Sequence, residues 1–527
     1  MNVGNEQSKS CWMGQTPVIQ ASPLTNHEQC DVVIVGAGIA GLSTAYELAR
    51  CGRLVVVIDR GEIGTGMTAR TTAHLATELD DFYSELIRVR GEDEARIYYD
   101  SQVAAVNRIE AICRDEDIDC QFTRLDGFLI PTDERPIADL QEEYDACRGI
   151  GVQVEWADRA PMPGLDTGRC LRFPDQARFH PTRYLGGLAR AILRLGGRIY
   201  SNTAYMNHEE VGGGVLVETA TGPSISAKAA VFATNSPVNA VVAIHTKYIP
   251  DRTYVIAARV PKGSVPDVLL WDTYEAYHYV RLQETDEGHD LLIVGGEDHR
   301  SGEADDADQR FARLAEWTRK RYPVFGEVEY SWSGQVLEPA DFMPYSGRSP
   351  GSDNVYVHTG DSGQGITNGV AGSLAITALI LGEDSRFADL LDPDRKSLTS
   401  TTSLAELARG QAGVIANFTE YVRQGEIKSV EDLEPGQGAI MRDGLRKLAV
   451  YKGEDGEIVR RSAVCTHVGC IVHWNSFEKC WDCPCHGSQF APDGEVLNGP
   501  AIKPLAEADQ DKSGATAAAR GSTVLSH

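Results

Sequence analysis

A glycine-rich turn between a buried strand and a helix constrains the fold of this chain more than any other feature. The apolar run Asp31-Val-Val-Ile-Val35 predicts a strand buried on both faces of a parallel sheet. Three glycines follow in the pattern GxGxxG: Gly36, Gly38 and Gly41. A helical pattern continues to about Arg50, and Leu54-Val-Val-Val-Ile58 is the next buried strand. A strand, this turn, a helix and a second strand predict a βαβ unit that binds a dinucleotide.

The residue types in this turn fit the contacts that a dinucleotide needs. Gly36 permits the tight turn, Gly38 lets the backbone approach the pyrophosphate, and Gly41 permits close packing of the helix on the strand. The unpaired N–H groups of the helix N-terminus face the phosphates. Asp59, which ends the second strand, is expected to accept hydrogen bonds from ribose hydroxyls. The pattern fits NAD and FAD equally, but no second complete GxGxxG follows a strand, which disfavours a flavoenzyme with its own NAD(P)H domain.

Length and charge limit the class of protein. A chain of 527 residues corresponds to about three domains of roughly 150 residues each. The net charge of −26 gives a surface that repels phosphate backbones and anionic lipid, so we expect no nucleic-acid partner. The most apolar run, residues 32–49, is interrupted by glycine, serine, threonine and glutamate, so we expect no membrane span. Residues 1–30 lack the pattern of a secretory signal, which makes the cytoplasm the expected location.

The predicted elements divide the chain into five parts. Residues 1–29 are expected to form an extended arm, and residues 30–395 alternate helices and strands. A polar linker with a helix is predicted over 396–425, an all-β module over 426–507 and a mobile tail over 508–527. Within the second part we expect helices near 93–114, 183–195 and 367–381, strands at 229–233 and 354–358, and a strand-rich region over 253–300.

Three segments in the first four hundred residues resemble the D-amino acid oxidase (DAO) superfamily. They are residues 31–59, the segment Gly64-Thr-Gly-Met-Thr-Ala-Arg-Thr-Thr-Ala-His74 and the segment from Val355 to Gly369. The resemblance implies an FAD-binding flavoprotein that oxidises C–N bonds of amines or amino acids. The implied fold class is α/β plus all-β, in which a Rossmann-like FAD-binding domain is interleaved with an α+β substrate domain and followed by a small antiparallel β domain.

The resemblance also implies which residues contact FAD. The expected contacts are Gly36, Gly38, Gly41, Asp59, Arg60, Arg70, Thr71, Thr72, His74, Gly360, Gly363, Gly365 and Thr367. Gly363 and Gly365 precede a helix whose positive end is expected to stabilise negative charge on the reduced flavin ring. Thr71-Thr-Ala-His74 is similar to a segment of some DAO relatives in which a histidine bonds covalently to the flavin, and a non-covalent contact is the alternative.

Five of the twelve cysteines lie within twenty-one residues near the C-terminal end. They are Cys465, Cys470, Cys480, Cys483 and Cys485. Cys465-Thr-His467 and Cys483-Pro-Cys485-His486 each combine a thiol with an imidazole, so two thiolates suit one iron and two imidazoles suit a second. A zinc site fits less well, because C-x-H plus C-x-x-H is not one of the usual zinc spacings.

This cysteine and histidine pattern resembles the Rieske [2Fe–2S] domains of cytochrome bc-type complexes. The resemblance implies Cys465 and Cys483 as ligands of one iron, and His467 and His486 as ligands of the other. It also implies a disulfide between Cys470 and Cys485, for which two free thiols are the alternative. Ser488 is expected to hydrogen-bond a cluster sulfur and Gly499-Pro500 to form a third, shielding loop, whereas Phe490 replaces a tyrosine of the bc-type pattern and Cys480 has no role in it.

A flavin and a [2Fe–2S] cluster in one chain predict an oxidoreductase that splits electron pairs. The expected activity is an FAD-dependent dehydrogenase that oxidises a small amine or amino acid and passes electrons through the cluster to an external acceptor protein. Candidate substrate contacts are Arg281 for a carboxylate and Tyr254, Tyr277, Tyr279 and Trp332 for an apolar pocket. Three alternatives remain: a Rieske oxygenase, a reductase in which the cluster feeds the flavin, and a non-enzymatic redox sensor. The oxygenase lacks a local two-histidine motif for a mononuclear iron.

Overall fold

Six strands form the sheet that carries the glycine-rich turn. The computed structural model describes residues 6–14, 18–134, 136–239, 242–285, 287–395, 417 and 419–508. In spatial order the sheet contains β18 (Tyr345–Arg348), β19 (Val355–Thr359), β12 (Ala229–Phe232), β2 (Val32–Val35), β3 (Val55–Ile58) and β8 (Arg198–Tyr200). All neighbours pair in parallel except β18, which is antiparallel to β19.

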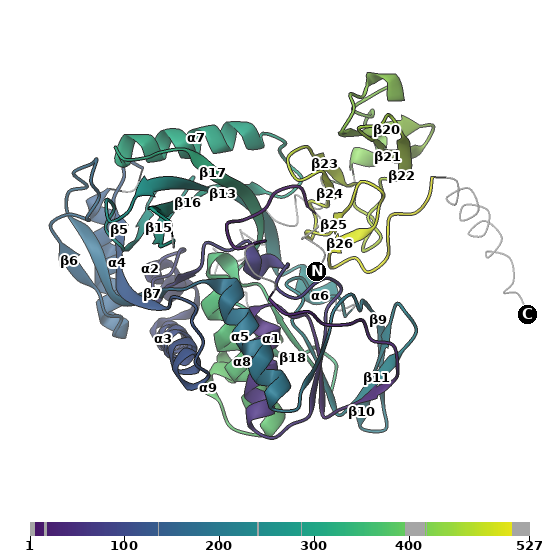
Figure 1. The fold of residues 1–527 in the computed structure, drawn as a ribbon, viewed down its shortest axis with the longest axis horizontal. Helices are drawn as coiled ribbons and strands as arrows, with labels where there is room; N and C mark the ends of the chain where they lie inside the picture. The colour runs from purple at the N-terminus through teal and green to yellow at the C-terminus, as the bar shows by residue number, and fades with distance from the viewer. Residues whose placement is uncertain are drawn as a thin grey trace, which may run out of the picture.

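The two faces of this sheet are covered by different layers. Alternate strand residues such as Ile34 and Val57 pack against three helices: α1 (Ile39–Arg50), α5 (Pro181–Arg194) and α8 (Gly365–Leu381). The intervening residues, such as Val35 and Ile58, pack against a four-stranded sheet of β1 (Glu28–Gln29), β11 (Ser224–Ala227), β10 (Gly214–Thr219) and β9 (Tyr205–Val211). Figure 1 shows the helices and the small sheet on opposite sides of the central strands. Both faces are therefore buried, which explains the unbroken apolar runs in the sequence.

A nine-stranded mixed sheet forms the second half of the large module, by which we mean residues 18–395. In spatial order it contains β17 (Val328–Pro339), β13 (Tyr248–Pro261), β16 (His289–Arg300), β15 (His278–Gln283), β14 (Leu269–Asp272), β5 (Thr123–Ile130), β7 (Cys170–Arg178) and β4 (His74–Leu75), with β6 (Glu155–Ala157) beside β7. Helix α7 (Ala307–Arg321) packs on β13 and β16. The remaining helices are α2 (Tyr83–Arg90), α3 (Glu92–Asp115), α4 (Ile137–Ile150), α6 (Val242–His245) and α9 (Arg386–Leu390).

The chain crosses between the two large sheets several times. The parallel sheet takes β2 and β3 from the start of the module, β8 and β12 from its middle and β18 and β19 from its end. The strands of the nine-stranded sheet lie in the chain between these three pairs. This interleaving confirms the fold class expected from the sequence. The predicted helices near 93–114, 183–195 and 367–381 are α3, α5 and α8, each within two residues of the expected bounds.

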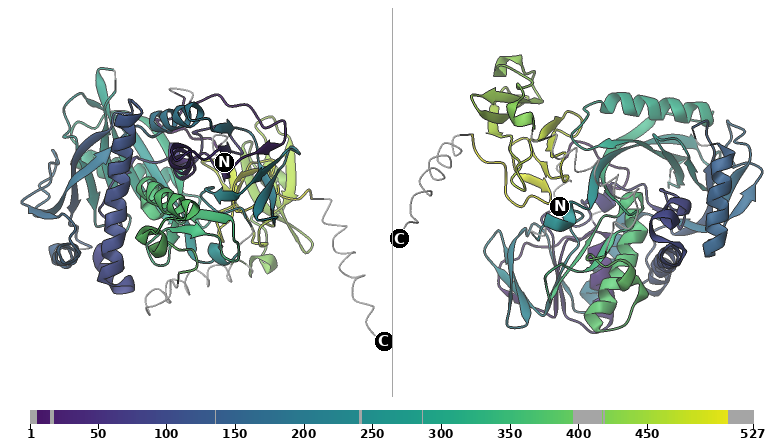
Figure 2. Two further views of the ribbon diagram at one scale, coloured as in Figure 1. Left: turned by 90° about the horizontal axis from the view of Figure 1, so that it is seen from below. Right: turned by 180° about the vertical axis from the view of Figure 1, so that it is seen from behind.

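The C-terminal module, residues 419–508, consists of two small antiparallel sheets. One contains β20 (Gln437–Asp443), β21 (Arg446–Lys452) and β22 (Ile458–Ser462), and the other contains β23 (His473–Asn475), β24 (Cys480–Asp482), β25 (Gln489–Phe490) and β26 (Val496–Asn498). Figures 1 and 2 show the second sheet against the large module and the first sheet projecting away from it. The predicted helix before residue 422 and the tail after 508 lie largely outside the described residues, which include only a short 3-10 turn at Thr419–Val422.

The N-terminal arm, residues 6–14, runs between the two modules. Glu6, Ser8, Ser10 and Trp12 are buried, whereas Gln7 and Lys9 are exposed. This alternation is that of an extended segment covered on one side. The arm is therefore packed along much of its length, although its sequence shows no apolar periodicity.

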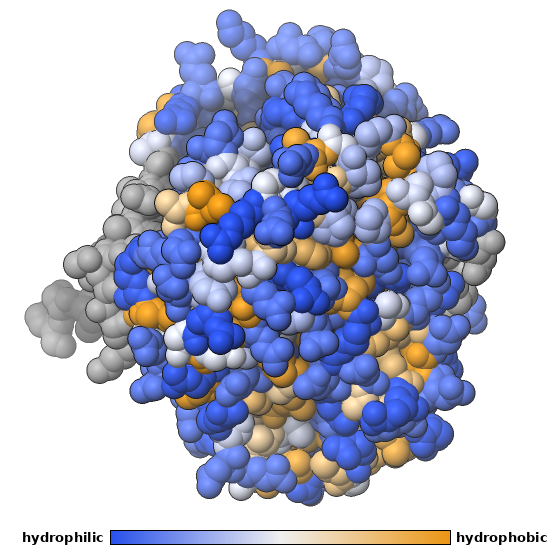
Figure 3. Space-filling model, turned by 90° about the vertical axis from the view of Figure 1, so that its left-hand side faces the viewer, coloured by the Kyte–Doolittle hydropathy of each residue, from blue (hydrophilic) through white to orange (hydrophobic). Residues whose placement is uncertain are grey.

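The segment Ser362–Leu381, which includes α8, has the length and apolar composition of a membrane span. In its most apolar window 67% of the residues are buried inside the structure, where α8 contacts α1 and α3. It is the single such helix among the residues that the structure describes. The face in Figure 3 is mostly hydrophilic, with apolar side chains scattered in small groups, as the high content of charged residues requires.

Replacement of Gly36 by alanine tests the turn on which the parallel sheet depends. Gly36 has φ +109°, and a Cβ there would lie 2.2 Å from the carbonyl oxygen of Ala233. Gly52 also has a positive φ (+77°), but a Cβ at Gly52 would have no atom within 4 Å, so Gly52→Ala reports backbone strain alone. We expect Gly52→Ala to lower the free energy of unfolding by about 1–2 kcal/mol. Gly36→Ala should lower it clearly further and reduce bound FAD. Equal effects in thermal unfolding and flavin content would show that the contact with Ala233 is unimportant.

Candidate active site and metal centre

A cavity of about 1100 Å³ lies at the carboxyl ends of the parallel strands. Gly36 follows β2, Asp59 follows β3, and Ala233 follows β12, and all three line it. Strands β13, β15 and β17 of the nine-stranded sheet form the opposite wall. Its volume exceeds the usual range for a single drug-sized ligand, so both a dinucleotide and a small substrate can be accommodated. Open α/β sheets bind ligands at this edge.

The glycine-rich turn is held by hydrogen bonds that leave its inner face open. The Asp59 carboxylate accepts from the Ala37 N–H at 2.7 Å and from the Gly61 N–H at 2.9 Å. The Thr68 hydroxyl accepts from the Ile39 N–H at 3.0 Å. A Cβ at Gly38 would meet only this hydroxyl, at 3.3 Å. The backbone at Gly38 therefore faces the cavity without a side chain in between, as a bound pyrophosphate requires.

Most of the residues expected to contact FAD lie in the wall of this cavity. They are Gly36, Gly38, Asp59, Arg60, Arg70, Thr71, Thr72, His74, Gly363, Gly365 and Thr367. Gly41 and Gly360 do not line it. A Cβ at Gly41 would lie 1.9 Å from the Gly36 carbonyl oxygen, so Gly41 is needed for packing of α1 on the turn. Gly360, with φ +75°, packs against Pro339 and Tyr345.

The guanidinium of Arg70 is committed to partners other than a flavin. It forms ion pairs with Glu6 at 3.0 Å and Glu478 at 3.1 Å, and it donates to the Ser333 carbonyl at 2.8 Å. The expectation that Arg70 contacts FAD stays a prediction that concerns the part of its side chain in the cavity wall. Its side chain lines the cavity, but its charge is neutralised at the interface with the C-terminal module.

His74 lies in the cavity wall with both ring nitrogens hydrogen-bonded. Nδ1 lies 3.0 Å from the Thr72 hydroxyl, and Nε2 lies 3.2 Å from the Val280 carbonyl oxygen, to which it must donate. Burial, helped by the nearby Arg281 charge, lowers the pKa of His74 to about 3, so the ring is neutral. A covalent bond from either nitrogen to the flavin would break one of these hydrogen bonds.

Of the five candidate substrate contacts, two line the cavity. The Tyr277 hydroxyl donates to Asp80 at 2.8 Å, and the Tyr279 and Thr253 hydroxyls lie 2.7 Å apart. Tyr277 has φ +42°, a sparsely populated conformation for a tyrosine, and such strain is concentrated at functional sites. Both tyrosines therefore remain candidates for the substrate-binding wall.

The structure places the other three candidates away from the cavity. Arg281 is fully buried and donates to the carbonyl oxygens of Ala73 at 2.9 Å and Phe179 at 3.0 Å, so it fixes the backbone beside His74 and cannot bind a substrate carboxylate. Trp332 donates to the Arg70 carbonyl at 2.8 Å, and Tyr254 stacks on His299. The sequence suggested a ligand contact because Arg281 alternates with tyrosines along a predicted strand. Only the packing shows which face of that strand its side chain occupies.

Sequence reasoning missed a group of carboxylates on the cavity wall. Its members are Asp80, Asp81, Asp251, Asp298, Glu338 and Asp361. Burial raises the pKa of Asp80 to about 6, and the hydrogen bond from Tyr277 opposes this shift. Burial raises the pKa of Asp251 to about 6. The Asp298 side chain is exposed to the open cavity, and desolvation by the surrounding cavity walls raises its pKa to about 7. Apart from Asp361, which lies in the segment 355–369, these residues belong to no motif, so no sequence signal predicted that they meet.

The four expected cluster ligands meet in the C-terminal module. Hydrogen bonds with Cys483 and Ser488 lower the pKa of the Cys465 thiol and outweigh the effect of burial, which would raise it. The centroids of the His467 and His486 rings are 5.0 Å apart. Both ring nitrogens of His467 and Nδ1 of His486 are buried without a hydrogen-bond partner. Buried imidazole nitrogens without partners fit metal ligation, because an unpaired buried polar atom is otherwise costly. Two thiols and two such imidazoles suit a Rieske [2Fe–2S] cluster.

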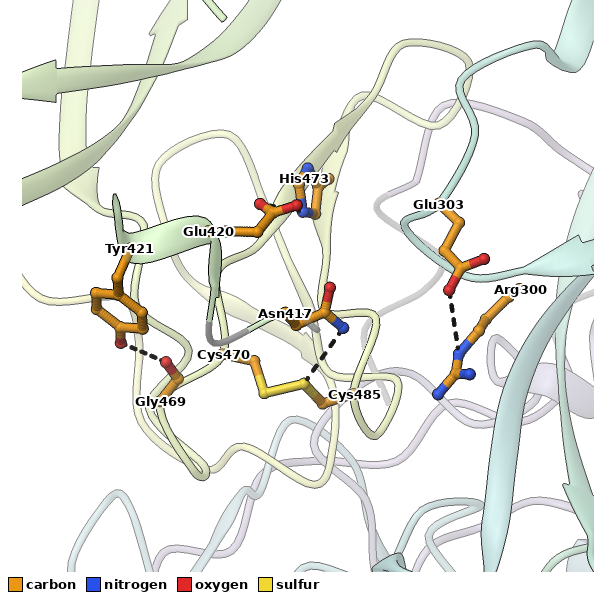
Figure 4. Close-up of a disulfide and its surroundings, with 9 residues drawn as sticks. All are labelled: Arg300, Glu303, Asn417, Glu420, Tyr421, Gly469, Cys470, His473 and Cys485. Atoms are coloured by element: carbon orange, nitrogen blue, oxygen red, sulfur yellow. Dashed lines mark hydrogen bonds and ion pairs between the residues drawn. A yellow bond between two sulfur atoms is a disulfide. The ribbon is translucent and has the colours of Figure 1, made fainter. Parts of the chain in front are cut away.

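Cys470 and Cys485 form a disulfide, which agrees with the expected pairing. Figure 4 shows the bond with Asn417 pointing at it, at 3.7 Å from the Cys485 sulfur. In the same view the Tyr421 hydroxyl donates to the Gly469 carbonyl, which closes the first cluster loop from outside. Cys480 is fully buried and burial raises its thiol pKa well above the ordinary value, as expected for an unreactive cysteine.

The cavity and the metal centre share a wall. His486, Cys485 and Gly499 of the C-terminal module line the same cavity as the glycine-rich turn. His245, at the end of α6, also lines it, and its ring centroid lies 4.6 Å from that of His467 and 6.1 Å from that of His486. His486 therefore faces the dinucleotide cavity, and the half-buried His467 is in ring contact with His245 of the cavity wall.

Comparison with known proteins supports both halves of this site. Residues 31–379 match the family model described as FAD dependent oxidoreductase (DAO). The chain belongs to this family. Residues 424–509 match the model of the Rieske [2Fe-2S] domain. The chain is thus a DAO-family oxidoreductase that carries a C-terminal Rieske domain, and its cofactors are FAD and a Rieske-type [2Fe–2S] cluster.

Three relatives show the range of similarity. YhfW of Bacillus subtilis (strain 168), whose name describes it as a Rieske 2Fe-2S iron-sulfur protein, is 30% identical over 96% of this chain and 98% of its own length. The gamma-glutamylputrescine oxidoreductase of Escherichia coli (strain K12) is 28% identical over 68% of this chain and 85% of its own length. The structure of glycine oxidase from Geobacillus kaustophilus superposes with a TM-score of 0.59 at 20% identity, over 70% of this chain and 99% of that one. This last likeness concerns the fold.

Denaturation tests the state of His74. Because both of its ring nitrogens are hydrogen-bonded, we expect FAD to be held without a covalent bond. Acid precipitation should therefore release the yellow colour into the supernatant, and mass spectrometry should give the unmodified chain of 57.3 kDa. A chain whose mass is increased by that of the flavin would contradict this expectation.

Ser488→Ala tests the hydrogen bonding of the cluster. The Ser488 hydroxyl accepts from the Ala501 N–H at 3.1 Å, which leaves its own proton free to donate to the Cys465 sulfur. One hydrogen bond of about 1 kcal/mol corresponds to roughly 40–60 mV in a one-electron couple. We expect Ser488→Ala to lower the midpoint potential by this amount, measured by a redox titration of the EPR signal. An unchanged potential with an intact cluster would exclude the bond to sulfur.

Proposed function

We propose that this protein is a dehydrogenase that oxidises a small cationic amine and delivers its electrons to an external acceptor through the Rieske cluster. One observation carries the proposal: the cavity that is lined by Gly38 is also lined by His486. Bound FAD would supply a two-electron hydride acceptor for the carbon beside the amine nitrogen, and a cluster held by Cys465, His467, Cys483 and His486 would carry the electrons one at a time to a one-electron acceptor.

The cavity wall itself favours a cationic substrate. Asp80, Asp298 and Glu338 face the cavity from three different segments. Carboxylates in a wall of limited polarity bind an ammonium group through charge-assisted hydrogen bonds. The only arginine proposed from the sequence for a substrate carboxylate, Arg281, is not in the wall. The name of the E. coli relative, which refers to an amine derived from putrescine, agrees with an amine substrate.

The same carboxylates can take the proton that an ammonium substrate must lose. Hydride leaves a neutral amine more readily than an ammonium, since the nitrogen lone pair stabilises the carbon that becomes electron-poor. A base with a pKa near the working pH is best suited to accept this proton. Asp298, which is exposed to the cavity and whose pKa is raised to about 7 by desolvation between the cavity walls, meets this condition, and the Asp80–Tyr277 pair lies in the same wall.

The direction of electron flow can be tested before the substrate has been identified. The holoprotein is titrated anaerobically with a panel of monoamines, diamines, N-acylated diamines and amino acids. We expect a cationic amine to bleach the flavin absorbance and then to produce the EPR signal of a reduced Rieske cluster. If only a ferredoxin-type donor reduces the cluster and the flavin, the result would instead support the reductase. If no donor changes the flavin absorbance or the EPR signal of the cluster, the result would support a redox sensor.

Asp298→Asn tests the role of the cavity carboxylates. Because the Asp298 pKa is raised to about 7, its carboxylate is charged above this pH, and kcat/KM for the amine should rise with pH up to about 7. Asn cannot ionise, so the variant should lose this limb and fall about tenfold or more in kcat/KM, since a hydrogen bond to a charged group contributes about 1.5–3 kcal/mol. Asp308→Asn, on the exposed start of α7, is the matched control and should change neither quantity. An unaltered pH profile in Asp298→Asn would remove this residue from the site.

A further inference from the structure

A buried ionic network fastens the C-terminal module to the large module. Two arginines of the large module meet three acidic residues of the other segments: Arg70 and Arg252 with Glu6, Glu478 and Asp482. All five side chains are at most 4% exposed. The network joins the N-terminal arm, the large module and the C-terminal module, which lie up to several hundred residues apart in the chain.

Arg252, on β13, makes the first connection. Its Nη2 lies 2.9 and 3.0 Å from the two carboxylate oxygens of Asp482, and its Nη1 donates to the Ser333 hydroxyl at 2.7 Å. Asp482 also accepts from Asn475 at 2.9 Å and from Gln489 at 3.0 Å. The carboxylate is therefore fully partnered inside the interface.

Glu478, in the turn between β23 and β24, makes the second connection. Its carboxylate accepts from Arg70 at 3.1 Å, from the Ser333 hydroxyl at 2.6 Å and from both the N–H and the hydroxyl of Ser8, at 3.0 and 2.6 Å. Burial raises the pKa of Glu478, but Arg70 and Arg252 outweigh this effect and hold the pKa below its ordinary value. Glu478 is therefore an anion, and each of its neighbours donates to it.

The N-terminal arm completes the network. Glu6 pairs with Arg70 at 3.0 Å and accepts from Gln489 at 3.0 Å, and the Gln7 N–H donates to the Glu478 carbonyl at 3.2 Å. Farther along, Trp12 donates to the Thr71 carbonyl at 2.7 Å. The arm is thus bound to both modules at once, and it lies over the segment that leads from Arg70 to His74.

This network is adjacent to the metal centre. Asp482 immediately precedes Cys483, and the carbonyl oxygen of Gly487, next to His486, accepts from Gln335 at 2.8 Å. The same Gln335 accepts from Asn498 at 2.7 Å. A change in the position of these contacts would move His486 and His467 relative to His245 and the cavity. Burying charges is costly, and the loss of one partner leaves another charge buried without compensation, so a displaced C-terminal module would break these pairs at a cost.

We propose that Glu478, Arg252 and the N-terminal arm form a docking lock that holds the Rieske histidines against the flavin cavity, and that Glu478 and Arg252 are positioning residues for electron transfer from flavin to cluster. The inference rests on the proposed function, because it assigns the lock to that electron-transfer step. The C-terminal module is therefore fixed in the position that accepts electrons and does not swing between two sites.

The test uses the holoprotein and needs no substrate. The flavin is reduced by light with deazaflavin as photosensitiser and EDTA as the sacrificial electron donor, and the rate at which the cluster becomes reduced is followed by its visible absorbance and by freeze-quench EPR. The variants are Glu478→Gln, Arg252→Met and the two combined. Arg70 is left unchanged because it also lines the cavity. Arg259→Met, on the same strand β13 but exposed and paired with Glu329, is the matched control.

We expect flavin-to-cluster transfer to slow about tenfold or more in the combined variant, because the loss of both buried connections should leave the undocked arrangement in excess. Direct reduction of an artificial dye by the photoreduced flavin should be unchanged, and so should the EPR g-values and the midpoint potential of the cluster. Arg259→Met should transfer at the wild-type rate. A combined variant that is folded, carries an intact cluster and still transfers at the wild-type rate would overturn the proposal.

A tether across the same interface distinguishes positioning from a local structural effect. The Ser476 hydroxyl lies 2.8 Å from the Asp305 carboxylate at the exposed rim of the interface. A disulfide between Asp305→Cys and Ser476→Cys should restore fast transfer to the combined variant, whereas the single Ser476→Cys should not. If the tethered protein does not regain the wild-type rate of flavin-to-cluster transfer, a positioning role is contradicted.

Solution scattering separates failure of the lock from failure of the proposed function. If wild-type photoreduced flavin does not reduce the cluster, the proposed direction of electron flow is wrong. The lock is still judged by small-angle X-ray scattering, in which the combined variant should show a larger radius of gyration than the wild type and the Arg259→Met control. Identical scattering curves for all three proteins would overturn the lock independently of any electron transfer.

Discussion

The parallel arrangement of β2, β3, β12 and β19 is the constraint on which the rest of the structure depends. Parallel strands end at one edge, so the residues that follow them converge there although they are far apart in the chain. Gly36, Asp59 and Ala233 meet in this way. The nine-stranded sheet then closes the space above this edge, which turns a dinucleotide site into a cavity with room for a substrate.

The second constraint is the cost of burying charge. Five ionisable side chains at the interface between the modules are stable only as a group, because removal of one partner leaves another charge buried without compensation. The interface therefore has one well-defined arrangement, in contrast to an apolar interface that could slide. This arrangement places His486 in the cavity wall, and under the proposed function it sets the distance over which electrons move between the two cofactors.

The sequence predicted those parts of the site that depend on short-range spacing. The GxGxxG turn and the two Cys/His pairs lie within single loops, so their side chains are close whatever the rest of the chain does. Arg281 shows the limit of such reasoning, since its alternation with Tyr277 and Tyr279 predicts a shared face. In the structure its guanidinium instead donates to the backbone carbonyls of Ala73 and Phe179 and to the Gln283 side chain. The carboxylates Asp80 and Asp298 were missed because long-range packing alone brings them together.

By itself the sequence determined the family, the two cofactors and the ligand types, because these follow from residue chemistry at fixed local spacing. The tertiary structure alone decided that the two cofactor sites share one cavity wall, that the cavity is lined by acids and that the N-terminal arm joins both modules. The physical reason is that contacts between segments hundreds of residues apart are set by the burial of surfaces and the pairing of charges in the folded chain, which leave no periodic signal in the order of the residues.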